Sequence, residues 1–440
     1  MRRFFSGNKS ILQLSGANLL VLGLPTILLP IFSRLYSEDD FAQFGIYTSI
    51  LALFVPFLSL HYQQAIPVPE KKEERDGLTQ ASLLLAALLS LFCLLALYLV
   101  PYFQNAIDPQ HLLLNEHLLG WGLLLIGFLF SGYLQIIQHW VLQGQYFGPF
   151  ARSKAVLAIT QSLSRYMLGV GKWVSGGLIW SYTLGLIMQV FSFGSNFKTG
   201  KFVGWGEMRV ILRKYASFYQ FGLPSSVLFA LTSALPLVLL GHFYGKSEIG
   251  QFSMALRLGS IPVFLLSTAF GQVYFAKAKE NKEVLTRVTL DFLQKMIRLA
   301  APLFVLGSFI VLPVGELVIG EQWTLALKIL LVLIPALFFN FLVLPLTHLF
   351  ELENRQDLGF YYAVFAFVFR LGPFAVALML DLDLMTSFLF LMLGNLTSNL
   401  VGFYFGFRLA SVKWKEIGVF NSVLCLSVLL IWSIRILFFN

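Results

Sequence analysis

Charged residues and cysteines are both scarce in this sequence. Only 12% of its 440 residues are Asp, Glu, Lys or Arg, and 58% are hydrophobic. A soluble domain is about 25% charged and about 45–50% apolar. The mean hydropathy is +0.78. This composition excludes a water-soluble globular protein, and the apolar runs leave almost no chain for a soluble catalytic domain.

The residues that usually mark an active or metal site are also missing. Cys93 and Cys425 both fall inside apolar runs, so they have the spacing of neither a disulfide framework nor a metal site. An apparent phosphate-binding loop at Gly241 has too few residues between its glycines. We predict no catalytic residues and no metal site. Four histidines lie on separate apolar runs without metal-ligand spacing: His61, His139, His242 and His348.

What the sequence has instead is a series of apolar runs, most near the ~20 residues that a helix needs to cross a bilayer. Only helices and closed barrels satisfy every backbone group in lipid, and barrel strands are shorter and alternate in polarity. We therefore predict an all-α polytopic membrane protein of about 12 spans plus a 13th at the C-terminus. The runs are 11–33, 42–65, 78–100, 118–141, 155–171, 175–194, 216–241, 249–275, 297–319, 325–350, 359–380, 386–407 and 417–438.

A connector rich in glycine and basic residues, 195–215, separates six runs from seven. We predict a six-helix lobe at 1–194, a second at 216–407 and an extra span at 408–440. An internal repeat supports this division, because residues 35–44 and 243–252 match at an offset of 208. Parallel repeats of this kind occur in transporters whose halves enclose a site near the membrane midplane. The repeat pairs Tyr36 with Tyr244, Asp40 with Glu248, Gln43 with Gln251 and Phe44 with Phe252.

Most of the 31 Lys and Arg residues lie in alternate connectors. This bias predicts a cytoplasmic N-terminus. Because these residues are dispersed over short connectors, they do not form the solvated basic face of a nucleic-acid binder. The stretch 277–295 has apolar residues near helical spacing with charges between them. We expect an amphipathic helix on the inner membrane surface, or alternatively a solvated loop helix.

Three arginines, Arg165, Arg257 and Arg370, lie near the middle of apolar runs where carboxylates are nearly absent. A central arginine costs about 2.5–3.5 kcal/mol on insertion scales, so it should face a polar cavity or a partner. We predict that these three line a cationic cavity that binds phosphate or diphosphate. The alternative is that neighbouring carbonyls or polar side chains satisfy them. We add as candidate gate or secondary contacts Arg34, His61, Gln138 and Lys328.

Several motifs, in order along the chain, resemble those of bacterial polysaccharide biosynthesis membrane proteins, the Wzx-type lipid-linked oligosaccharide flippases. This sequence has His61-Tyr62-Gln63 where relatives commonly carry Arg-Tyr-Glu, so a charged pair has become neutral. The motifs are Ser33–Phe41, Ser59–Pro69, Phe221–Pro224, Leu256-Arg257 with Pro262, Gly320–Trp323 with Ala326, and Leu344-Pro345 with Arg355.

The resemblance implies the fold of the multidrug and oligosaccharidyl-lipid exporters, in which two six-helix bundles surround a central cavity. It implies an undecaprenyl-diphosphate-linked oligosaccharide as cargo, moved to the outer leaflet of the bacterial cytoplasmic membrane for a surface polysaccharide such as lipopolysaccharide or capsule. The expected partners are this cargo, membrane lipids, and the glycosyltransferases and polymerase of the pathway. We expect no cofactor beyond a coupling ion, H⁺ or Na⁺.

Two other functions fit the composition. A cation or drug antiporter of the same fold would need carboxylates inside a lobe, and the sequence offers few. A membrane-embedded glycan polymerase or ligase would need a sizeable outward domain. The longest connector on the predicted outer side, 101–117, is short. We therefore favour a transporter over an enzyme.

Overall fold

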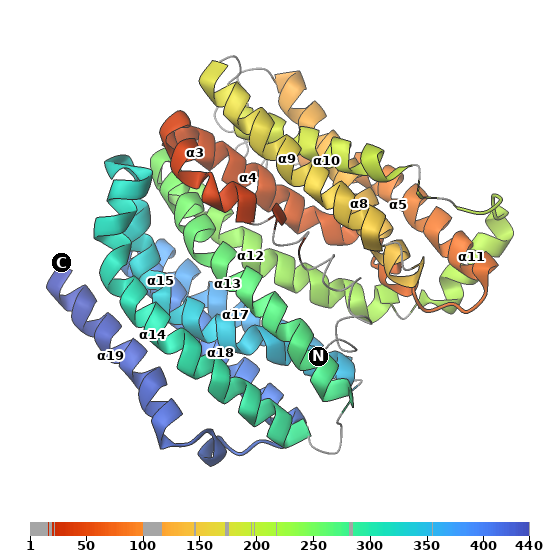
Figure 1. The fold of residues 1–440 in the computed structure, drawn as a ribbon. Helices are drawn as coiled ribbons and strands as arrows, with labels where there is room; N and C mark the ends of the chain where they lie inside the picture. The colour runs from red at the N-terminus through yellow and green to blue at the C-terminus, as the bar shows by residue number, and fades with distance from the viewer. Residues whose placement is uncertain are drawn as a thin grey trace. The chain divides into compact units, whose positions relative to one another are not determined.

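The protein, seen in a computed structural model, is built from helices (Figure 1). All regular structure in the described residues is helical, which confirms the prediction of an all-α membrane protein. Nine of the described helices are long and apolar enough to cross a membrane. The described residues are 16, 20, 21, 23–99, 117–144, 147–171, 176–194, 196, 197, 199–216, 218–280, 285–353 and 355–439.

The chain divides into two compact units, 1–250 and 251–440. The predicted lobe boundaries at 194, 215 and 407 stay predictions. Three long helices, α9, α13 and α19, are not among the nine spans just counted. Unit 1 contains α3 (Leu29–Leu35), α4 (Glu38–Phe54), α5 (Lys72–Leu99), α8 (His117–Gly144), α9 (Phe147–Gly171), α10 (Gly177–Gly194), α11 (Trp205–Lys214) and α12 (Leu223–Phe243).

Unit 2 is organised around α15, of which 83% is buried in its most apolar window. Phe338 and Phe341 of this helix are almost fully buried, as is Met296 of α14. Helix α13 starts in unit 1 and continues into unit 2. The helices of unit 2 are α13 (Lys246–Glu280), α14 (Leu285–Ile319), α15 (Thr324–Val343), α16 (His348–Leu352), α17 (Gln356–Met379), α18 (Leu384–Leu409) and α19 (Val419–Phe439).

The second apolar run does not stay helical to residue 65 as predicted. Helix α4 starts with a capping box between Ser37 and Asp40 and ends at Phe54. A short 3-10 turn at 55–57 contains Pro56, which lacks the N–H that a continuing helix needs. Leu60 and His61 then adopt left-handed backbone conformations, with φ of 48° and 67°. The run therefore ends in a tight polar turn.

The predicted surface helix at 277–295 is also wrong. Helix α13 runs to Glu280, and α14 is one continuous 35-residue helix from Leu285. Val288 and Phe292 pack against the core of unit 2, and the Phe292 ring lies 4.8 Å from that of Tyr274. Val288 and Phe292 therefore pack against neighbouring helices. Residues 281–284, part of the first run and connector residues 101–116 lie outside the described residues.

The internal repeat is visible in the backbone. Tyr36 ends α3 in an extended conformation, and Tyr244 ends α12 in the same way. The next helices begin two residues later, at Glu38 and Lys246, which are 208 positions apart. The matching sequences thus form matching helix-break-helix junctions.

The connector between the two predicted lobes is anchored to α5. Lys214 Nζ lies 2.7 Å from Glu74 Oε2, and this hydrogen bond raises the pKa of Lys214. The side-chain oxygen of Gln80 accepts from the Val203 N–H at 2.9 Å. Helix α11 is therefore held at the start of α5, where the charged first turn of α5 lies.

Candidate functional site

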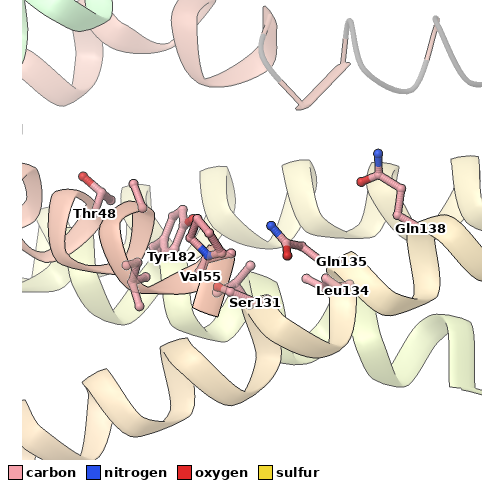
Figure 2. A pocket seen from close by; sticks show the side chains of 11 residues that line it. Thr48, Val55, Ser131, Leu134, Gln135, Gln138 and Tyr182 are labelled. Atoms are coloured by element: carbon pink, nitrogen blue, oxygen red, sulfur yellow. The ribbon is translucent and has the colours of Figure 1, made fainter. Parts of the chain in front are cut away.

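A cavity of about 390 Å³ lies within unit 1 among α4, α8 and α10 (Figure 2). Its volume is in the range of small-molecule sites, roughly 300–1,000 Å³. No charged side chain is among its lining residues. The lining residues are Thr48, Leu51, Ala52, Val55, Pro56, Ser131, Leu134, Gln135, Gln138, Tyr182 and Leu186.

One polar stripe on α8 forms much of the wall. Ser131, Gln135 and Gln138 are spaced at i, i+4 and i+7, so they lie on one helix face, as Figure 2 shows. The rest of this helix is strongly apolar. Of the predicted site residues, Gln138 lines this cavity. The helical spacing of the three polar residues is the signal in the sequence that could have found the others.

Gln135 is held in place by a chain of hydrogen bonds behind the cavity. The Gln63 side-chain amide donates to Gln135 Oε1 at 3.2 Å, and the Ser59 hydroxyl donates to Gln63 Oε1. Ser59 and Gln63 flank the left-handed turn at His61. With its oxygen engaged, Gln135 keeps its N–H₂ group as a donor.

Tyr182 supplies an aromatic ring, which neighbouring rings hold in position. Its centroid lies 5.7 Å from that of Phe44 and 6.2 Å from that of Tyr47, both edge-on. Tyr47 is itself fixed, because its hydroxyl donates to the Leu123 carbonyl at 3.0 Å. The cavity thus combines amides and hydroxyls with one rigid aromatic face.

Arg165 is buried inside unit 1 and does not line the cavity. Only 5% of its surface is exposed, and its guanidinium carbon lies 5.3 Å from the ring centroids of both Phe32 and Phe44. Its Nε donates to Ser181 Oγ on α10 at 3.3 Å. These contacts fit the alternative prediction for the three arginines, in which neighbouring groups satisfy the charge of the side chain. A role in binding cargo stays a prediction.

Arg370 repeats this arrangement in unit 2. It lies on α17, and its Nε donates to Ser398 Oγ on α18 at 3.0 Å. Its Nη2 donates to Asn399 Oδ1 at 3.3 Å, and Asn399 donates to the Ala336 carbonyl of α15. Arg370 is half-buried, unlike Arg165. Each arginine therefore joins its own helix to the next one in the chain.

The other predicted cations differ in exposure. Arg257 is half-buried on α13, whereas Lys328 is exposed on α15 and Arg34 is exposed in the last turn of α3. Arg257, Lys328 and Arg370 belong to unit 2, and Arg34 and Arg165 belong to unit 1. The structure brings none of these five to the cavity wall.

His61 is buried at a contact between its turn and the start of α12. Its Nδ1 lies 3.3 Å from the Ser226 hydroxyl. Gly222 packs so closely that a Cβ there would lie 2.3 Å from the His61 ring. Gly222 closes a π-helical turn, Phe218–Gly222, a feature often found at functional positions. This geometry fits the predicted gate role, which stays a prediction.

A second contact joins the two repeated connectors. The Ser247 hydroxyl, at the start of α13, donates to Glu38 Oε2 at the start of α4. Gly250 packs directly on the Glu38 backbone, since a Cβ at Gly250 would lie 2.1 Å from the Glu38 carbonyl oxygen. Glycine is therefore required for the close approach of these two helix ends.

Within the described part of the chain, no group of three or more His, Cys, Asp or Glu could hold a metal ion. The two cysteines there are free thiols. The chemistry offered by the cavity is therefore hydrogen bonding and aromatic contact.

Comparison with known proteins gives a family match over most of the chain. The model of the family described as polysaccharide biosynthesis protein matches residues 31–328. Among curated proteins, the teichuronic acid biosynthesis protein TuaB of Bacillus subtilis (strain 168) is 27% identical over 159 residues. That stretch is 34% of this chain and 32% of TuaB, so the match spans about a third of the relative's length.

Solved membrane transporters share the fold. The lipid II flippase MurJ, in an inward closed conformation, matches with a TM-score of 0.68 and 16% identity over 95% of this chain and 93% of its own. An inward-facing multidrug resistance MATE family transporter of the MOP superfamily matches with a TM-score of 0.64 and 15% identity, over 92% and 98%. At these identities the likeness shows the fold alone.

Proposed function

The chain belongs to the polysaccharide biosynthesis protein family, and on that premise we propose that it is a lipid-linked oligosaccharide flippase. It moves an undecaprenyl-diphosphate-linked oligosaccharide from the inner to the outer leaflet of the bacterial cytoplasmic membrane. The cargo serves a surface polysaccharide such as lipopolysaccharide or capsule. The protein transports this lipid and performs no covalent step.

The sign of the charge within the long helices carries the proposal. In the described long helices, every Asp and Glu lies in the first two turns or the last turn of its helix. Arg165, Arg257 and Arg370 lie deeper along their helices. A cation transporter needs buried carboxylates, whereas an interior with arginines and no central acid favours an anionic headgroup.

The half-buried arginines of unit 2 are the better candidates for the diphosphate. Arg370 uses Nε and Nη2 for Ser398 and Asn399, and its Nη1 group remains as a donor. Arg257 lies on α13 at a similar level of exposure. Arg165 is buried among aromatic rings, where it stabilises the packing of unit 1 instead of binding the diphosphate.

The contact between the repeated connectors supports alternating access. A pathway that opens to one face at a time needs a contact that closes one end and can separate. Glu38 with Ser247 and Gly250 provides such a contact on the predicted outer side. His61 with Ser226 provides a second contact, on the predicted inner side. The cycle is driven by the cargo or by a coupling ion, H⁺ or Na⁺, acting on these contacts.

The test is the fate of the cargo in cells that lack the protein. We expect the glycolipid to accumulate in the inner leaflet and surface glycan to disappear, with both restored by the wild-type gene. Normal surface glycan in the deleted strain would contradict the proposal. Efflux of a cationic dye that depends on Glu316 would favour an antiporter instead. Glu316 lies near the end of α14 and accepts from Thr324 at 2.8 Å.

A further inference from the structure

We propose that the cavity among α4, α8 and α10 binds the sugar part of the cargo and leaves the diphosphate to another part of the protein. This inference rests on the proposed function, because it assigns one portion of that cargo to one site. It concerns residues of unit 1 alone.

The chemistry of the lining matches a neutral polyol. Its polar groups are two amides, from Gln135 and Gln138, and the hydroxyls of Thr48, Ser131 and Tyr182. Amides and hydroxyls both donate and accept hydrogen bonds, as sugar hydroxyls do. An apolar chain would offer no partner to the Gln135 N–H₂ group or to the Gln138 amide.

The same lining disfavours an ion. A diphosphate buried here would meet no cation, and a cationic ligand would meet no carboxylate. Arg165, a predicted site cation of unit 1, lies over the rings of Phe32 and Phe44 instead. Its charge is engaged there rather than offered to the cavity.

Two features prepare the site before any ligand arrives. Gln135 is oriented by Gln63, so its N–H₂ group is a fixed donor. Tyr182 is held by two edge-on rings and offers a flat apolar surface, against which the C–H face of a sugar can pack. Gln138 is exposed and free to adapt (Figure 2). A fixed donor, a fixed aromatic surface and an adaptable amide suit recognition of a glycan.

The experiment measures binding of the glycan without its lipid. Lipid-linked glycan from host membranes is cleaved by mild acid, and the released, fluorescently labelled oligosaccharide is titrated into the purified full chain. We expect saturable binding to the wild type. We expect about three- to tenfold weaker binding to Gln138→Ala, as for the loss of one or two neutral hydrogen bonds. Ser233→Ala, at an exposed serine of unit 1 outside the cavity, should bind like the wild type.

Charged substitutions identify the class of ligand. For a neutral glycan, Gln138→Glu and Gln138→Lys weaken binding to a similar extent. In transport of the intact glycolipid, a large loss with Glu and a gain with Lys would show that the diphosphate occupies the cavity and would overturn the proposal. The opposite pattern with a cationic dye would show a cation site and would also overturn it.

The outcome separates this inference from the proposed function. If the wild type moves the intact glycolipid but does not bind the released glycan, the sugar site is wrong and the flippase stands. If the released glycan binds in a Gln138-dependent manner but the glycolipid is not moved, the site stands and the flippase is wrong. Thermal melting of each variant confirms that it is folded. Gln138 is a suitable position for substitution, because its exposed side chain can be replaced without disturbing the packing.

Discussion

Gly250→Ala should prevent the two repeated connectors from closing on each other. The added Cβ would lie 2.1 Å from the Glu38 carbonyl oxygen and 2.8 Å from the carbonyl carbon, whereas ordinary contact begins at 3.4 Å. Both atoms belong to the backbone, so no side-chain rotation relieves the clash, and the helix ends must part by more than about 1 Å. Such overpacking costs about 1–3 kcal/mol. If the cost falls on the closed state alone, the closed population decreases about 5- to 150-fold relative to the open one.

Cross-linking measures this change directly. With the two native cysteines replaced by alanine, Glu38→Cys and Ser247→Cys place thiols at a pair that is hydrogen-bonded in the structure. A short thiol cross-linker should join them efficiently, and Gly250→Ala should reduce the yield and slow transport. Gly241→Ala is the matched control, since its Cβ would meet only the Ile249 side chain, at 3.4 Å. Equal cross-linking and transport in Gly250→Ala and the control would show that this contact does not control closure.

Three further predictions concern the arginines and their helices. Gly394→Ala should lower the melting temperature, because its Cβ would lie 2.2 Å from a backbone carbonyl oxygen of α17, while Gly372→Ala, with nothing within 4 Å, should not. An unchanged melting temperature would contradict the close packing of α17 on α18. Arg165→Met should destabilise unit 1 by about 1–3 kcal/mol through the lost hydrogen bond and ring contacts. Full stability together with abolished glycolipid binding would instead restore Arg165 to the cargo site. Replacing Arg257 and Arg370 by glutamine should reduce transport at least about tenfold, as expected for lost charge-assisted hydrogen bonds. Wild-type transport rates in this double variant would remove the diphosphate role.

The fold class could be predicted because the bilayer imposes it. Lipid requires helices about 20 residues long, so apolar runs locate them well, as at 118–141 for α8. The predicted helix bounds were wrong where a helix extends past its apolar run or stops before the run ends. Helix α14 continues through the charged stretch before residue 297, because Val288 and Phe292 pack against the core of unit 2. Helix α4 stops at Phe54, just before Pro56, and the chain then turns through left-handed backbone at Leu60 and His61, which hydropathy does not report.

The site was harder to predict because a charged residue stands out in an apolar run, whereas a neutral polar residue does not. The arginines were conspicuous in apolar runs, yet Arg165 is satisfied by Ser181 and two aromatic rings. The cavity is lined by uncharged groups such as Gln135, which in a single run also resembles ordinary helix packing. Three helices are needed to bring these residues together, and contacts between helices leave no mark in a single sequence.

Flippase activity is measured most simply by following the movement of the glycolipid itself. The purified protein is placed in vesicles that contain fluorescent undecaprenyl-diphosphate-linked oligosaccharide, and a quencher outside the vesicles reports the fraction in the outer leaflet. A flippase makes the inner pool accessible faster than protein-free vesicles do, and the arginine double variant should be slower. Inner and outer pools that exchange no faster with the protein than without it would contradict the account.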